Sequence, residues 1–233
     1  MDSVIPGKSE DEIRQPQKAA ATTAETLAVL RQLARKRAPL ERCEMCSREL
    51  APEHDHLVEP IARRIVCACE PCAILFDGRE GTKYKRVPRR VLFLQSFQLT
   101  GAQWDGLTIP IAMAFFFKST PQGKIIALYP SPAGPTESLL SLETWHDIAQ
   151  ANPILDQMEP DVTALLVNRV GHTRGYAAAE YYLVPIDECY KLVGLIRAHW
   201  HGLSGGTEVW REIGRFFATL KKRSAIVTGP ARA

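Results

Sequence analysis

Four cysteines in two closely spaced pairs are the residues of this sequence best suited to chemistry. Cys43 and Cys46 form one Cys-x-x-Cys pair, and 22 residues separate it from a second pair, Cys69 and Cys72. Each pair can turn two thiolates toward one ion, so that two pairs complete a tetrahedron. Because four protein ligands leave no open position for water or substrate, the spacing predicts a structural metal site.

Zinc is the ion that this site favours, and iron in a rubredoxin-like electron-transfer protein is the alternative. Glycines normally follow rubredoxin knuckles and let backbone amides approach the sulfurs, whereas Ser47 and Ala73 follow the pairs here. Five of the six cysteines lie between Cys43 and Cys72, a clustering that favours metal binding over disulfides. The segment CEPCAILF predicts a turn that opens into a short helix, as in a treble-clef finger.

Four further side chains between the two pairs could also bind metal. Cys67 either faces a small core or replaces Cys69 as a ligand. His54, Asp55 and His56 lie where an HNH-type nuclease holds a catalytic metal. Such a nuclease also needs an Asn or His after the second pair, and AILFDGREG contains neither. We therefore expect His54 and His56 to be polar hairpin residues or alternative metal ligands.

A short basic stretch follows the cysteines and could contact a partner protein or phosphates. It contains Lys83, Lys85, Arg86, Arg89 and Arg90. The formal net charge of the chain is only +3, which makes a nucleic-acid partner the weaker interpretation. The sequence contains no nucleotide-binding loop, no meaningful Ser-His-Asp order and no persuasive carboxylate pair, so we expect no catalytic activity and assign no catalytic residue.

The elements that must position these residues divide the chain into five parts. We predict a disordered leader over residues 1–21, a helix over 22–40 and a treble-clef or zinc-ribbon-like metal module over 41–80. An α+β domain over residues 81–223 and a flexible tail over 224–233 complete the chain. Thr22 and Glu25 have capping-box spacing, and this supports the first helix.

Alternating and helical patterns in the α+β domain predict a mostly antiparallel sheet with C-terminal helices. Apolar residues alternate over 107–117, as a strand with one buried face requires. Further strands are predicted at VLFLQSF, KIIALYP, TALLVNR and EYYLVPI. A helix should follow Ser141, and two more should begin at Asp187 and Thr207 with apolar stripes at helical spacing.

The composition is that of an ordinary folded soluble protein. Apolar residues make up 45% and charged residues 24% of the chain. The first residues lack the apolar core of a secretory signal, and no run approaches the roughly 20 apolar residues that a membrane span needs. We therefore expect a cytoplasmic protein without a membrane span.

Two stretches resemble an uncharacterised family that is encoded beside nickel–iron hydrogenases in actinobacteria and other bacteria. The cysteine segment running into CEPCAILFDGREGTKYKRVPRRV carries the first likeness. The second lies in the tail, where a Trp-x-Gly-(x)2-Gly-Gly signature falls on Trp200, Gly202, Gly205 and Gly206. The resemblance implies an accessory role, with a hydrogenase subunit or maturation factor as the partner. It implies no reaction.

Overall fold

The computed structural model describes five stretches of the chain. They are residues 41–78, 83–139, 142–173, 178–202 and 204–228. The predicted leader over 1–21 and the predicted helix over 22–40 lie outside these stretches. None of the helices in them is both long enough and apolar enough to cross a membrane.

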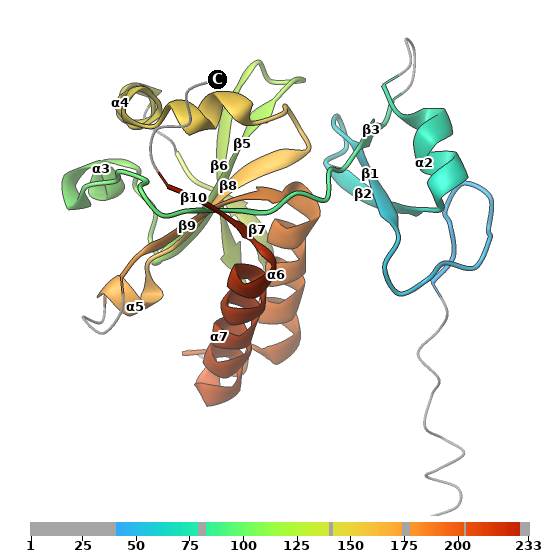
Figure 1. Cartoon of the computed structure of the whole chain (residues 1–233). Coiled ribbons are helices and arrows are strands. Elements are labelled where there is room, and N and C mark those ends of the chain that lie inside the picture. Colours follow the sequence, from blue (N-terminus) through green and yellow to red (C-terminus); the bar gives the residue numbers. More distant parts are fainter. Residues whose placement is uncertain (1–40, 79–82, 140–141, 174–177, 203, 229–233) are drawn as a thin grey trace, which may run out of the picture. The chain divides into compact units, whose positions relative to one another are not determined.

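The chain around residues 43–72 folds into a small sheet and a short helix (Figure 1). The sheet has the strand order β2-β1-β3, with both pairs antiparallel. Its strands are β1 (Asp55–Glu59), β2 (Arg64–Ala68) and β3 (Lys85–Arg86). Helix α2 (Glu70–Phe76) follows β2 and packs on β1 and β3. The third strand therefore comes from beyond residue 80, where we predicted that the module ends.

A seven-stranded sheet forms the centre of the remaining chain, in the order β10-β4-β9-β8-β5-β6-β7. Its strands are β4 (Leu92–Leu94), β5 (Met113–Ser119), β6 (Lys124–Ser131), β7 (Gly134–Glu137), β8 (Thr163–Asn168), β9 (Glu180–Pro185) and β10 (Ala225–Val227). Every neighbouring pair is antiparallel except β10 and β4. The predicted α+β class with a mostly antiparallel sheet is confirmed.

Helices cover both faces of this sheet. One face packs on α6 (Ile186–His199) and α7 (Gly206–Arg223), and the other on α3 (Gly101–Gly106), α4 (Leu142–Ala151) and the 3-10 turn η1 (Pro153–Gln157). A four-residue helix, α5 (Val170–Thr173), follows β8. The predicted C-terminal helices are therefore present, and they close one side of the sheet.

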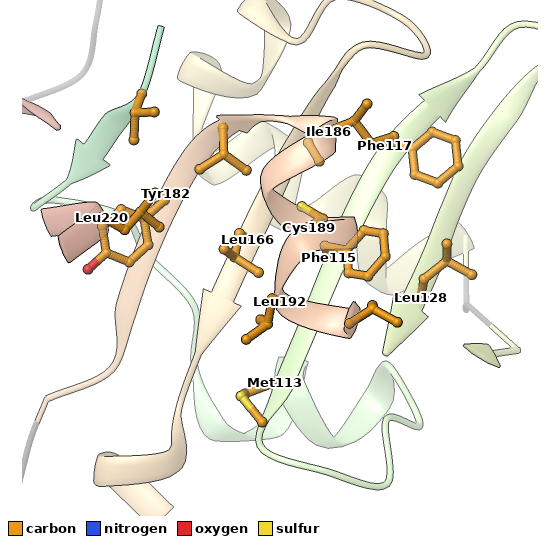
Figure 2. Packing of buried hydrophobic residues seen from close by; sticks show 14 of the residues in the cluster. Met113, Phe115, Phe117, Leu128, Leu166, Tyr182, Ile186, Cys189, Leu192 and Leu220 are labelled. Atoms are coloured by element: carbon orange, nitrogen blue, oxygen red, sulfur yellow. The ribbon is translucent and has the colours of Figure 1, made fainter. Parts of the chain in front are cut away.

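Strand β5 shows why two helical layers are needed. Phe115 belongs to the cluster under α6 and α7, whereas Phe116 packs on the opposite face, where its ring stacks on Trp145 of α4. Both phenyl rings are fully buried, and burying one contributes about 1.5–3 kcal/mol. Figure 2 shows Phe115 close to Cys189 of α6, among the apolar side chains that hold this helix on the sheet.

A left-handed turn joins α6 to α7 and explains the tail signature. Gly202, Gly205 and Gly206 all have positive φ angles, of 63°, 84° and 72°. The ring of Trp200 lies against Gly205, so a Cβ there would lie 3.0 Å from ring carbons of Trp200 and 2.9 Å from Val209 Cγ1. Gly205, and not Thr207 as we predicted, is the residue before α7. The signature thus reflects the positive φ angles of its three glycines and the close packing of Trp200 on Gly205.

The structure differs from the sequence-based elements at three further places. Strand β5 begins at Met113 and not at residue 107, because Leu107 ends helix α3. We did not predict α3, although Thr100 and Gln103 form a reciprocal capping box at its start. Residues 225–227 form β10 beside β4, so the chain continues as a strand where we predicted a flexible tail.

Candidate metal centre

The first cysteine pair lies on a tight turn that backbone hydrogen bonds hold closed. Arg42 and Glu49 form an isolated antiparallel bridge at the base of the turn, and the Cys43 amide donates to the Arg48 carbonyl over 2.8 Å. Ser47 adopts φ = 62°, and its amide donates to the Cys43 carbonyl over 2.8 Å. The left-handed residue after Cys46 bends the chain so that both thiols of the pair point the same way.

The second pair lies where β2 gives way to helix α2. Cys69 is the extended residue before the helix, and Cys72 lies in its first turn behind Pro71. The Ala73 amide donates to the Cys69 carbonyl over 2.8 Å. Proline suits the first turn of a helix because its missing amide would have no partner there. The sequence CEPC therefore places one thiol before the helix and one within it.

The four sulfurs converge as a tetrahedral site requires. The Sγ atoms of Cys43, Cys46, Cys69 and Cys72 all lie within 4.8 Å of one another, and those of Cys46 and Cys69 are 3.6 Å apart. Zinc–sulfur bonds of about 2.3 Å in a tetrahedron put sulfurs about 3.8 Å apart. Only Cys46 of the four is exposed. The predicted ligands are thus brought together, and the cluster fits one metal ion.

The electrostatics of the thiols fit a cation between them. Burial opposes ionisation of Cys43, but backbone amide hydrogen bonds, the largest from Cys69, outweigh it and lower the Cys43 pKa to about 6. Burial, and next the hydrogen bond with the Cys69 thiol, raises the Cys72 pKa to about 12. One thiolate forms readily, whereas Cys72 needs a positive charge beside it before it ionises.

Cys67 does not join these four sulfurs. It pairs with His56 across β1 and β2, and its Sγ lies within 4.8 Å of donor nitrogens of His54 and His56. The chain turns into α2 directly after Ala68, so Cys69 leaves the strand and reaches the four-cysteine cluster. The three side chains that we named as alternative ligands therefore form a group of their own.

Asp55 takes no part in this group, because adjacent residues of a strand point to opposite faces. Its side chain is buried and accepts hydrogen bonds from Arg86 and Arg89, at distances of 3.0–3.3 Å. The Asp-His arrangement of an HNH nuclease would need this carboxylate beside the histidines. Asp55 instead pairs with two arginines.

Most of the basic stretch is held in ion pairs within the chain. Lys83 contacts Glu59 at 3.4 Å, and Lys85 contacts the buried Asp161 at 2.6 Å. Arg86 and Arg89 both contact Asp55, while Arg90 is exposed. These pairings lower the net charge that the stretch presents to a phosphate.

The sequence did not predict that Asp187 lies beside His56. Its Oδ2 lies 2.8 Å from His56 Nδ1, although 131 positions separate the two residues. We expected Asp187 to cap α6, but Pro185 precedes the helix, and Asp187 lies in its first turn. No local pattern could have signalled this contact, because the fold alone brings the start of α6 to β1.

Comparison with known proteins identifies the family to which the chain belongs. No curated protein matches the chain, and no solved structure matches it. A family model described as a family of unknown function (DUF5947) matches residues 42–224. The match covers the four-cysteine segment, every strand of the two sheets except β10, and both C-terminal helices, so this chain is a member of that family.

Proposed function

We propose that this protein is a non-catalytic accessory protein that binds a subunit or maturation factor of a nickel–iron hydrogenase through a zinc-stabilised module. The observation that carries the proposal is the closed cluster of Cys43, Cys46, Cys69 and Cys72, next to exposed apolar side chains of the same module. The hydrogenase link rests on the family resemblance of the cysteine segment and of the Trp200–Gly206 signature.

The module supports a structural zinc site of the treble-clef type. A knuckle at Cys43 and Cys46 comes first, the hairpin of β1 and β2 follows, and helix α2 then supplies Cys72. This is the order in which a treble clef presents its ligands. Four thiolates around one ion leave zinc no position for a substrate, which supports a role in folding and docking.

Helix α2 offers the docking surface. Its inner face buries Cys72 and Ala73, whereas Ile74 is 56% and Leu75 47% exposed. Ile61, at the turn between β1 and β2, is 83% exposed. Adjacent apolar residues on an exposed face of a short helix are typical of a protein contact. Zinc would fix this face by anchoring the first turn of α2.

A rubredoxin-like iron protein is the second candidate, and one observation favours it. Ser47 adopts the left-handed conformation that glycine usually supplies after a rubredoxin knuckle. Its side chain therefore does not prevent the turn from closing around iron. Elemental analysis of chain purified without added metal separates the two candidates: zinc in colourless protein supports the first, and iron with a visible absorption band supports the second.

The partner proposal can be tested by capture from the native host. Wild-type chain should recover a hydrogenase subunit or maturation factor, and the double variant Ile74→Glu/Leu75→Glu should lose it while keeping its metal. Leu139→Glu is the matched control, because Leu139 is 92% exposed but lies in the connection that follows β7. The proposal would be contradicted if the wild-type chain recovered neither a hydrogenase subunit nor a maturation factor. It would also be contradicted if the double variant recovered as much of the partner as the wild-type chain.

A further inference from the structure

Three metal-binding side chains converge outside the four-cysteine cluster. The donor atoms of His54, His56 and Cys67 all lie within 4.8 Å of one another. The two imidazole rings meet edge to face with their centroids 4.8 Å apart. His56 and Cys67 are register partners on β1 and β2, so the antiparallel pairing of the hairpin fixes their separation.

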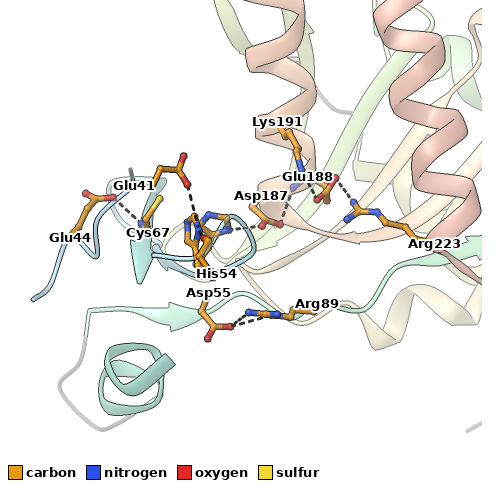
Figure 3. A network of polar contacts seen from close by, with 12 residues as sticks. Glu41, Glu44, His54, Asp55, Cys67, Arg89, Asp187, Glu188, Lys191 and Arg223 are labelled. Atoms are coloured by element: carbon orange, nitrogen blue, oxygen red, sulfur yellow. Dashed lines mark hydrogen bonds and ion pairs between the residues drawn. The ribbon is translucent and has the colours of Figure 1, made fainter. Parts of the chain in front are cut away.

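The Nδ1 atom of each imidazole lies within hydrogen-bond distance of an oxygen. His56 Nδ1 lies 2.8 Å from Oδ2 of Asp187, and His54 Nδ1 lies 3.0 Å from the Ala51 carbonyl. A carbonyl can only accept, so His54 Nδ1 carries the proton and Nε2 carries a lone pair. Histidines that bind metal through Nε2 are held in this way, with the other nitrogen donating to a carboxylate or carbonyl. Figure 3 shows His54 and Asp187 within one polar network.

The Nε2 atom of His54 is a buried acceptor without a hydrogen-bond partner. The His54 side chain is only 7% exposed, so water does not compensate for the missing contact. An unsatisfied buried acceptor destabilises the folded chain. A metal ion between His54, His56 and Cys67 would satisfy this lone pair, and the described structure offers it no other partner.

Two carboxylates make the surroundings negative. Glu41 Oε2 lies 3.5 Å from His54 Nδ1, and Glu44 Oε1 accepts a hydrogen bond of 2.9 Å from the Cys67 amide. Figure 3 shows both glutamates next to His54 and Cys67. Arg64 pairs with Glu44 at 3.5 Å, so Glu41 supplies the less compensated negative charge, which would stabilise a cation bound nearby.

We propose that His54, His56 and Cys67 form a second metal site, which binds a borderline-soft divalent ion of the Zn²⁺ class through two nitrogens and one sulfur. Three protein ligands leave a fourth position for water or an exchangeable ligand, unlike the closed four-cysteine site. Asp187 is a positioning residue, because it fixes the ring of His56. The site does not depend on which partner the protein binds.

A nucleophilic Cys67–His56–Asp187 triad would use the same atoms, but the thiol is poorly suited to it. Burial, and next the negative charges of Glu41 and Glu44, raises the pKa of Cys67. A nucleophilic cysteine needs the opposite surroundings, which favour its thiolate.

Metal titration of the tag-free full chain tests the site, with Zn²⁺ and the spectroscopic probe Co²⁺. Wild-type chain should bind two equivalents, and His54→Gln and Cys67→Ser should each bind one while keeping the Co²⁺ absorption of a four-sulfur site. Asp187→Asn should keep two equivalents and bind the second about 10–100-fold more weakly. Cys189→Ala is the cysteine control and should keep both, because Cys189 lies buried in α6.

Alkylation by iodoacetamide provides an independent measurement. The second equivalent of Zn²⁺ should protect Cys67 from modification in wild-type chain, and His54→Gln should abolish that protection. Saturation of wild-type chain at one equivalent would overturn the proposal. Binding of two equivalents by Cys67→Ser would also overturn it. Loss of both equivalents in Cys67→Ser would overturn it too, because that result would place Cys67 in the structural site.

Discussion

At the residue scale, the four cysteines should decide whether the module folds. A structural zinc ion contributes on the order of 10 kcal/mol to a small module. Cys43→Ser or Cys72→Ser should therefore lose the structural ion and unfold the small sheet, as metal analysis and the thermal melting profile would record. Cys67→Ser is the matched control and should keep the structural ion. Full metal content with unchanged melting in Cys43→Ser would contradict the ligand assignment.

The pKa of Cys72 predicts how metal affinity depends on pH. Because burial and the neighbouring thiols raise this pKa to about 12, Cys72 is protonated at neutral pH without metal and must release a proton when an ion binds. Affinity should therefore rise with pH, by about tenfold per unit for each proton released. Chelator competition at pH 6, 7 and 8 measures the slope, and an affinity independent of pH would contradict the prediction.

The cysteine spacing was enough to predict the four-sulfur cluster, whereas the polar contacts around it were not predictable. Two Cys-x-x-Cys pairs form locally, so their geometry follows from the nearby chain. The contact between His56 and Asp187 depends on how α6 meets β1, which no local pattern encodes. For the same reason the grouping of His54 with Cys67 needed the register of the hairpin.

At the element scale, the turn between α6 and α7 should tolerate only glycine at position 205. Gly205→Ala combines a positive φ angle with a Cβ that would lie within 3.0 Å of Trp200 and Val209. We expect a loss of about 1–3 kcal/mol in the free energy of unfolding, measured by urea denaturation. Gly214→Ala is the matched control.

Gly214 lies inside α7, and nothing lies within 4 Å of an added Cβ. Alanine has the higher helix propensity, so Gly214→Ala should stabilise the chain by about 0.5–1 kcal/mol. Equal stability of Gly205→Ala and wild-type chain would show that the turn relaxes at little cost. The explanation of Gly205 in the signature by its packing against Trp200 would then be wrong.

Long, strongly patterned elements were predictable from sequence, and short ones were not. Strands β5, β8 and β9 and helices α6 and α7 are all long enough to show alternation or an apolar stripe. Helix α3 has only six residues, and β10 only three. Strand β10 exists because β4 offers an edge beside it, which is a property of the sheet and not of residues 225–227.

At the scale of the whole molecule, polar and apolar contacts join the small sheet to the large one. Val58 of β1 packs in the same apolar cluster as Phe117 of β5. Lys85 of β3 pairs with Asp161, and Arg63 contacts Glu137 of β7 at 3.1 Å. The module is therefore held in place by the large sheet, and this packing would give the metal sites a fixed relation to α6.

Asp161 should be the polar residue on which this junction depends most. Its buried carboxylate accepts hydrogen bonds from the Thr120 amide at 2.8 Å and from Lys85 Nζ at 2.6 Å, and its φ angle is 72°. Asp161→Ala leaves the Thr120 amide without this acceptor, removes the ion pair with Lys85 and puts alanine in a left-handed conformation. We expect a loss of about 2–4 kcal/mol in the free energy of unfolding, measured by urea denaturation.

Asp161→Asn separates the charge from the backbone geometry. Asparagine tolerates the left-handed conformation and keeps one acceptor oxygen for the Thr120 amide. Lys85 is 37% exposed, so water can solvate its ammonium when the carboxylate is gone. Asp161→Asn should therefore lose less than half as much stability as Asp161→Ala. Equal losses of unfolding free energy in the two variants would instead assign the stabilisation to the ion pair with Lys85. A change below about 0.5 kcal/mol in both variants would show that the junction does not depend on Asp161.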